Sequence, residues 1–193
     1  MPRIDAPTVA EHRANQEQVL LAAARELLLS KGVGAVTPAA VGAAAGLARS
    51  SVYKYFPSGE EILARIVVDS FASWGRIVGE AVAAAEGADA RVIAYVRATM
   101  ELAGAGAHRI AVLGGAGLTD ASARERISRT HHEMAEPLRQ ALAERGDPEP
   151  ELTAELVDGA LGQAIDRIDA GDGFDRVLST TVRFIGRALN LEE

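Results

Sequence analysis

The sequence contains no cysteine, which excludes disulfide bonds and metal sites built on thiolates. Aromatic residues make up only 4% of the chain, and no stretch alternates convincingly between apolar and polar residues, so β-structure is not expected. No run of about 18 apolar residues occurs, so we expect no segment that spans a membrane. The first residues lack the apolar core of a secretory signal. We therefore expect a cytoplasmic protein without a membrane partner.

The residues that are abundant, chiefly Ala, Leu, Arg and Glu, are strong helix formers, and they predict an all-α fold. A chain of 193 residues is long enough for one or two domains with a sizeable core. Its net charge of −7 is unevenly distributed, because residues 1–57 hold six basic and four acidic side chains. The rest holds the other 14 basic and 23 acidic ones. Such asymmetry is typical of a small nucleic-acid-binding domain attached to an acidic body.

The stretch from Thr37 to Leu63 is the most informative part of the chain. Thr37 followed by Pro38 predicts the start of a short helix, and Gly46 predicts its end. A second helix is predicted from about Arg49 to Phe56. Two short helices joined by a tight turn form a helix-turn-helix, whose second helix enters the DNA major groove. Glycine-terminated helix pairs also occur in other all-α proteins, so the spacing alone leaves DNA binding and ordinary packing equally open.

The residue types within the second predicted helix separate a buried face from an exposed one. Val52 and Phe56 are four residues apart, so both can pack against the preceding helix. Other faces carry donors for base edges and phosphates: Arg49, Ser50, Tyr53 and Lys54.

This region resembles the N-terminal signature of the TetR family of bacterial transcriptional regulators, from about Gln16 to Leu63. The resemblance rests on Thr37, Val41, Ala45-Gly46-Leu47, Val52-Tyr53-Lys54-Tyr55-Phe56 and Glu61-Ile62-Leu63. Two positions depart from the family pattern. Ala48 stands where members often have a capping Ser or Thr, and Gly59 stands where many have a lysine that contacts phosphate.

The resemblance implies a fold of about nine helices in two domains. Residues 1–60 would form a three-helix DNA-binding domain, and residues 61–193 a helical ligand-binding and dimerisation domain. The last two helices, predicted near residues 150–170 and 174–189, would form a homodimer interface. The residues expected to contact an operator in double-stranded DNA are Thr37, Arg49, Ser50, Ser51, Tyr53, Lys54 and Tyr55.

Helical periodicity gives further expectations along the chain. The first helix, from about His12 to Lys31, should bury Val19, Leu20, Ala23, Leu27 and Leu28. A long helix should start at Ser58 and end near Glu86, and Asp89 should cap the next helix. One continuous helix is expected from about Thr119 to Arg145.

A small hydrophobic effector is expected in the C-terminal domain, as in the family. Candidate lining residues are Trp74, Tyr95, Met100, His108 and Met134, for which ordinary core packing is the alternative. We expect no cofactor and no metal, because His131 and His132 point about 100° apart on a helix and HExxH is absent.

The leading hypothesis is a ligand-responsive DNA-binding transcriptional regulator, a repressor that binds a palindromic operator as a homodimer and is released by a small molecule. The alternative is a helical small-molecule-binding protein, or an enzyme, without DNA activity. No catalytic triad order, metal cluster or nucleotide-binding loop stands out in the sequence, so we expect no enzyme.

Overall fold

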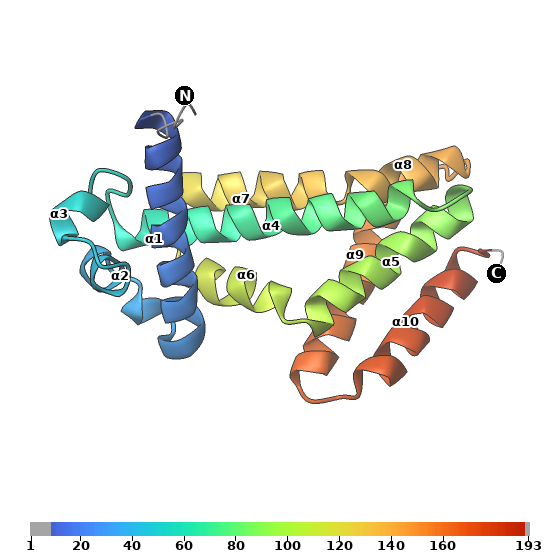
Figure 1. Cartoon of the computed structure of the whole chain (residues 1–193). Coiled ribbons are helices and arrows are strands. Elements are labelled where there is room, and N and C mark those ends of the chain that lie inside the picture. Colours follow the sequence, from blue (N-terminus) through green and yellow to red (C-terminus); the bar gives the residue numbers. More distant parts are fainter. Residues whose placement is uncertain (1–8, 192–193) are drawn as a thin grey trace, which may run out of the picture. The chain divides into compact units, whose positions relative to one another are not determined.

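The helix formers of the sequence produce an all-α protein, as predicted (Figure 1). The computed structural model describes residues 9–191, and in this part of the chain the helices are joined by short turns without any strand. They are α1 (Val9–Lys31), the 3₁₀ helix η1 (Val33–Ala35), α2 (Pro38–Ala44), α3 (Arg49–Val52), α4 (Gly59–Ala83), α5 (Ala88–Gly104), α6 (Ala107–Gly115), α7 (Ala121–Met134), α8 (Glu136–Glu144), α9 (Pro150–Asp169) and α10 (Phe174–Ala188).

The helix expected to run from about Thr119 to Arg145 is divided into α7 and α8. The division falls at Ala135, two residues before Pro137, which lies in the first turn of α8. Proline lacks the N–H of a helical hydrogen bond, and its ring clashes with the carbonyl four residues earlier, so it favours a helix start over a helix interior. Pro137 therefore explains why the predicted single helix is two.

The chain packs as two compact units. The first contains residues 9–68 and Ile110–Ile127, and the second contains Asp69–Arg109 and residues 128–191. Helices α4, α6 and α7 contribute residues to both. The boundary expected at residue 60 divides the chain by function, into DNA binding and ligand binding, whereas these units are defined by packing. Residues 1–8 of the expected DNA-binding domain lie outside the described residues.

The core of the first unit is formed by α1 together with α2, α3 and the start of α4. The buried face of α1 differs from the prediction, because Val19 is 42% exposed, whereas Leu21 and Ala24 are buried. Ala23 and Leu27 are half-buried, and Leu20 and Leu28 are buried as expected. The first helix has Ala or Leu at most positions between Leu20 and Leu29, so its periodicity does not fix a single face.

The core of the second unit is assembled from α4, α5, α8, α9 and α10, and its larger buried side chains include Trp74, Tyr95, Met100, Leu138 and Ile185. Asp89 does not cap α5, contrary to the prediction. Gly87 occupies the N-cap position, and the Asp89 carboxylate pairs instead with Arg145. Arg145 also donates to the carbonyl of Leu189 at 2.9 Å, so one guanidinium joins the start of α5 to the end of α10.

Among the described helices, none combines the length and the apolar character that crossing a bilayer requires.

Candidate functional site

The helix pair α2 and α3 of the first unit begins as the sequence predicted (Figure 1). Thr37 is the N-cap of α2, and its Oγ1 accepts the backbone N–H of Ala40 at 3.2 Å, while Pro38 is the first helical residue. Gly46 follows α2 with a φ of 69°, a conformation that glycine adopts without strain. The turn between the two helices is therefore short and well defined.

The second helix is shorter than predicted. It runs from Arg49 to Val52, and turns continue to Tyr55. Its N-cap, Ala48, makes no side-chain hydrogen bond, as expected from the absence of a hydroxyl. Beyond Val52, the Tyr55 N–H donates to the Val52 carbonyl at 2.9 Å, a tighter turn than an α-helix. Pro57 is a second reason why the helix ends early, because the helical conformation is disfavoured for the residue that precedes a proline.

The side chains of this segment divide into a buried and an exposed set. Val52 and Phe56 are buried in the core of the first unit, as predicted. The candidate DNA contacts Thr37, Arg49, Ser50, Tyr53 and Lys54 are exposed, whereas Ser51 and Tyr55 are half-buried. The seven candidates therefore lie on the helix pair and the turn that follows it, and five of them are exposed.

Arg49 and Tyr53, one helical turn apart, are in direct contact. The Arg49 Nη2 donates to the Tyr53 hydroxyl at 2.8 Å, and the guanidinium carbon lies 5.4 Å from the centre of the Tyr53 ring. Both side chains are exposed, so the contact with Tyr53 fixes the conformation of an arginine side chain that would otherwise be free in solvent. Tyr55 is paired in a similar way, with the guanidinium of Arg13 5.7 Å from its ring centre.

The glycine at position 59 has a structural reason. A Cβ at Gly59 would lie 2.4 Å from the carbonyl oxygen of Val36, so the backbones of two segments approach too closely for any side chain. The lysine that many family members have here therefore does not fit this backbone. Next to it, Ser58 caps α4 by accepting the Glu61 N–H at 3.1 Å.

Glu60 lies in the first turn of α4, and its partner could not be predicted from the sequence. Its carboxylate accepts the backbone N–H of Thr119 at 2.5 Å and that of Asp120 at 2.6 Å, just before α7. These hydrogen bonds, the one from Asp120 first, hold the pKa of Glu60 below its usual value. Glu61 pairs with Arg126 of α7 at 3.0 Å. Two consecutive carboxylates thus join the start of α4 to the start of α7 within the first unit.

The ligand candidates lie in the second unit, where the structure brings four of the five together. Trp74, Tyr95, Met100 and Met134 belong to one buried cluster. His108 is buried as well, but its Nε2 lies 2.5 Å from a carboxylate oxygen of Asp169 on α9.

Tyr95 and Asp158 form a partly buried pair in this unit, in which the Tyr95 hydroxyl donates to the carboxylate at 3.0 Å. Burial, followed by the nearby charge of Asp158, raises the pKa of Tyr95. Burial also raises the pKa of Asp158 above its usual range.

Three buried polar atoms of the second unit have no hydrogen-bond partner among the described residues. They are Trp74 Nε1, Thr99 Oγ1 and His108 Nδ1. Buried polar groups are normally hydrogen-bonded, so each orphaned atom requires an explanation, of which a bound ligand is one. Sequence reasoning named Trp74 and His108 but missed Thr99, because an isolated threonine in a helix gives no signal.

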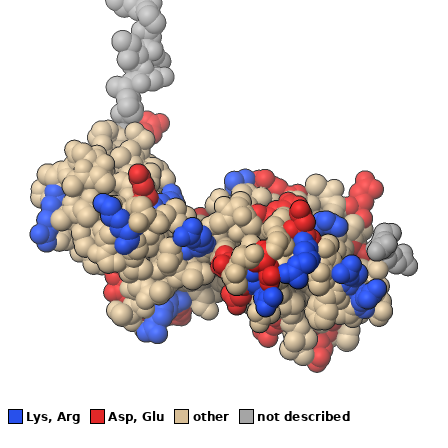
Figure 2. Space-filling model, turned by 90° about the horizontal axis from the view of Figure 1, so that it is seen from below, with Lys and Arg blue, Asp and Glu red and all other residues tan. Residues whose placement is uncertain are grey.

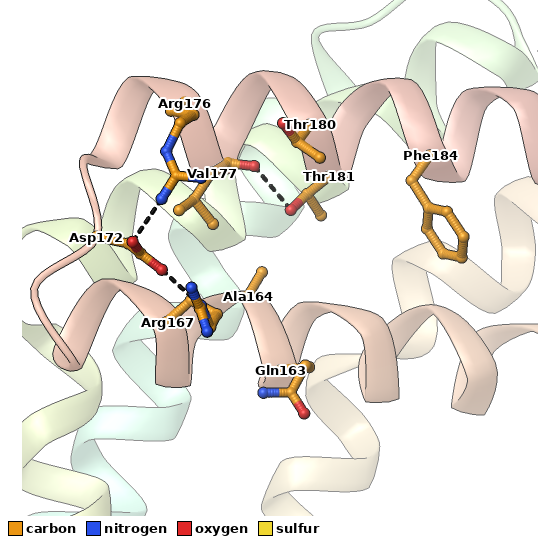
Figure 3. A pocket seen from close by; sticks show the side chains of 9 residues that line it. All are labelled: Gln163, Ala164, Arg167, Asp172, Arg176, Val177, Thr180, Thr181 and Phe184. Carbon is orange, nitrogen blue, oxygen red and sulfur yellow. Dashed lines mark hydrogen bonds and ion pairs between the residues drawn. The ribbon is translucent and has the colours of Figure 1, made fainter.

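The outer faces of α9 and α10 carry exposed apolar side chains. Leu156 is 67% exposed and Phe184 is 61% exposed, and Leu152 is also exposed. A Cβ built on Gly159 or Gly162 would meet no atom within 4 Å, so the space beside α9 is open. Figure 3 shows Phe184 beside a small pocket of about 300 Å³, at whose edge Asp172 pairs with both Arg167 and Arg176.

Residues 20–66 match the sequence profile of the bacterial regulatory proteins of the tetR family. Residues 20–66 thus carry the N-terminal sequence signature of that family. The matched residues extend from the buried part of α1 to the first turns of α4, and they include the helix pair with its exposed donors. Among proteins with curated functions, none matches the sequence.

Solved structures of regulators share the fold over most of both chains. The transcriptional regulator FadR from Bacillus subtilis, in complex with stearoyl-CoA, has a TM-score of 0.73 at 16% identity, covering 87% of this chain and 96% of that one. PfmR, a TetR family transcriptional regulator from Thermus thermophilus, has a TM-score of 0.65 at 19% identity, covering 90% and 98%. A TetR/AcrR family regulator from Thermobifida fusca has a TM-score of 0.74 at 17% identity, covering 93% and 99%. At these identities the likeness establishes the fold.

Proposed function

We propose that this TetR-family protein is a ligand-responsive repressor that binds a palindromic operator in double-stranded DNA as a homodimer. The observation that supports this most strongly is that the side chains of the helix pair divide into a buried set and an exposed set. Val52 and Phe56 anchor it in the core, while Arg49, Tyr53 and Lys54 face solvent. Exposed donors on a short helix and on the turn after it suit the DNA major groove.

Each donor has a role that follows from its chemistry. Arg49 reads guanine, because its guanidinium can donate to O6 and N7 together. Lys54 and the hydroxyls of Thr37, Tyr53 and Tyr55 contact phosphates, and Ser50 and Ser51 supply short donors beside them.

Figure 2 shows scattered basic side chains on the face of the first unit, with acidic ones among them. The N-terminal 57 residues carry an excess of only two positive charges. Charge alone therefore gives modest affinity, and dimerisation supplies the rest.

The homodimer would form through α9 and α10. Leu152, Leu156 and Phe184 are apolar and exposed, and the open space at Gly159 and Gly162 allows a second helix to approach closely. A stable interface of this kind buries about 1,200 Å² or more in total. Two recognition helices would then meet half-sites about 34–36 Å apart.

The effector would be a small hydrophobic molecule in the second unit, lined by Trp74, Tyr95, Met100 and Met134. The orphaned Trp74 Nε1, Thr99 Oγ1 and His108 Nδ1 would donate to or accept from it. FadR from Bacillus subtilis, which has the same fold, binds stearoyl-CoA, a molecule with a long apolar chain. This likeness, with the absence of a catalytic arrangement in the sequence, favours a regulator over an enzyme.

Release from DNA would pass through α7, which carries Met134 in the second unit and Arg126 in the first. An effector that displaces α7 would disturb the contacts that Glu60 and Glu61, at the start of α4, make with α7 and the residues just before it. The segment that would contact DNA, α3 with the turn to Tyr55, comes just before α4 in the chain, so a shift of α4 would move it. The effector would therefore favour a conformation in which the DNA-contacting side chains are poorly placed.

The proposal is tested by fluorescence anisotropy with mixed-sequence duplex DNA at low salt. Saturable binding that weakens steeply with added salt supports it. Absence of binding at low salt would leave the protein as a small-molecule-binding protein without DNA activity.

A further inference from the structure

A groove between α5 and α10 is separate from every site described above. We call it the basic groove and define it by Ile93 and Arg97 of α5 and by Leu178, Val182, Arg183 and Arg187 of α10. Its volume is about 980 Å³. Cavities that hold small molecules typically measure about 300–1,000 Å³, so the basic groove is large enough for a ligand of substantial size.

The arginines of the basic groove differ from most others in the second unit. Of the eleven arginines in the described part of that unit, six form ion pairs with carboxylates. Of the other five, three line this one groove: Arg97, Arg183 and Arg187. Asp175 is the acidic residue of the lining, so the groove has an excess of positive charge on an otherwise acidic part of the chain.

Three arginines beside a single carboxylate repel one another, which raises the free energy of the folded protein, and a bound anion relieves that cost. Guanidinium groups also suit carboxylates and phosphates, which they can bind through two parallel hydrogen bonds. The arginines therefore favour an anionic group over a neutral or cationic one.

The floor of the basic groove is apolar. Leu178 and Val182 are half-buried against the core of the second unit, and Ile93 is half-buried beside them. At the C-terminal end of α10, Asn190 adopts a φ of 49°, and the Leu191 N–H donates to the Gly186 carbonyl at 2.9 Å. This turn brings Leu191 into the lining of the groove. An apolar floor under a charged rim suits a molecule with an alkyl part and an anionic part.

The basic groove and the proposed dimer face lie on different flanks of α10. The pocket of Figure 3 is lined by Thr180, Thr181 and Phe184, whereas the groove is lined by Leu178, Val182 and Arg183. The two linings share no residue. A ligand in the groove would therefore leave the dimer face free.

We propose that the basic groove binds an amphipathic organic anion, with the alkyl part on Ile93, Leu178 and Val182 and a carboxylate or phosphate on Arg97, Arg183 and Arg187. This site is distinct from the effector site proposed at Trp74 and Thr99, and it does not depend on DNA binding.

The test is isothermal titration calorimetry of the full chain with decanoate and with decyl phosphate, each below its micelle concentration. Both should bind saturably, and decyltrimethylammonium and decanol should bind at least about tenfold more weakly, because neither offers an acceptor anion to the arginines. Comparison of the two anions distinguishes a carboxylate site from a phosphate site.

Variants locate the binding in the basic groove. Arg97→Gln and Arg183→Gln should each weaken decanoate about tenfold, since each removes charge-assisted hydrogen bonds. Arg109→Gln is the matched control, because Arg109 is an arginine of the same unit outside the groove and should leave the affinity unchanged. Ala90→Trp at the exposed edge of the groove should block binding while the circular dichroism spectrum stays that of the wild type.

No saturable binding of either anion would overturn the proposal, and so would equal binding of decyltrimethylammonium. Unchanged decanoate affinity in both groove arginine variants would overturn it as well. If only an acidic helical peptide bound, the groove would be a protein-docking surface and the proposal would be wrong.

Discussion

The carboxylate of Glu60, in the first turn of α4, accepts the backbone N–H of Asp120 at 2.6 Å, immediately before α7. Asp120 in turn caps α7, because its Oδ1 accepts the Ser122 N–H at 2.9 Å. Two hydrogen bonds from Ser122, first that of its backbone N–H and then that of its hydroxyl, hold the pKa of Asp120 below its usual value. The N-terminus of α4 is thereby held against the start of α7 by the carboxylate of Glu60.

Glu60→Gln should reduce stability in a pH-dependent way. The folded-state pKa of Glu60 lies below its usual value of 4.5, so the ionised carboxylate stabilises the folded protein above that pH. This contribution disappears as the pH falls through the lowered pKa. Urea unfolding midpoints should therefore differ between wild type and variant at pH 7 and converge in acid. Glu80→Gln, in an exposed pair with Arg76, is the control and should show little difference. A Glu60→Gln effect that is the same at every pH would contradict this account.

Lys54→Ala should weaken binding to all DNA sequences alike. Lys54 is an exposed cation on the turn after α3, and a phosphate contact releases about one counterion. The slope of log affinity against log salt should therefore become shallower by about 0.9 per DNA-bound protomer. Lys31→Ala, at the end of α1, is the matched control and should leave the slope unchanged. Altered base preference in Lys54→Ala would mean that Lys54 reads bases instead.

Gly162→Arg should convert the homodimer into folded monomers. Gly162 has no atom within 4 Å of a built Cβ, so an arginine fits the isolated chain but would occupy the space of the partner's helix. Sedimentation velocity at micromolar concentration measures the change. Gly79→Arg on α4 makes the same substitution at another open position and should remain dimeric. A wild-type protein that sediments as a monomer would refute the dimer proposal.

Thr99→Val should stabilise the protein without effector by about 1 kcal/mol, because it replaces a buried hydroxyl that lacks a partner among the described residues. Thr181→Val is the matched control. Its Oγ1 donates to the Val177 carbonyl at 2.9 Å, so the same change should destabilise by a similar amount. Urea unfolding of both variants provides the comparison. Equal destabilisation by the two substitutions would show that Thr99 is hydrogen-bonded in solution.

Local sequence signals predicted the parts of the fold that depend on single residues. Thr37, Pro38 and Gly46 set the ends of α2 through capping and backbone conformation, and these were correctly predicted. The prediction of the buried face of α1 was wrong at Val19, because a helix rich in Ala and Leu presents several apolar faces. The break at Pro137 was overlooked.

Features that depend on residues far apart in sequence could not be predicted. The contact of Glu60 with Thr119 and Asp120 joins positions about 60 residues apart. The close approach of Gly59 to Val36 likewise depends on how two turns meet. The orphaned Thr99 hydroxyl is recognised only once its surroundings are known.

The central claim, that α3 reads an operator, is tested most directly by selection from a random-sequence duplex library with wild type and with Arg49→Ala. The wild type should enrich an inverted repeat whose half-site centres lie about 34–36 Å apart. Arg49→Ala should bind that sequence ~1–3 kcal/mol more weakly and lose its preference at one guanine in each half-site. Enrichment of no sequence by the wild type, or an unchanged guanine preference in Arg49→Ala, would contradict the account.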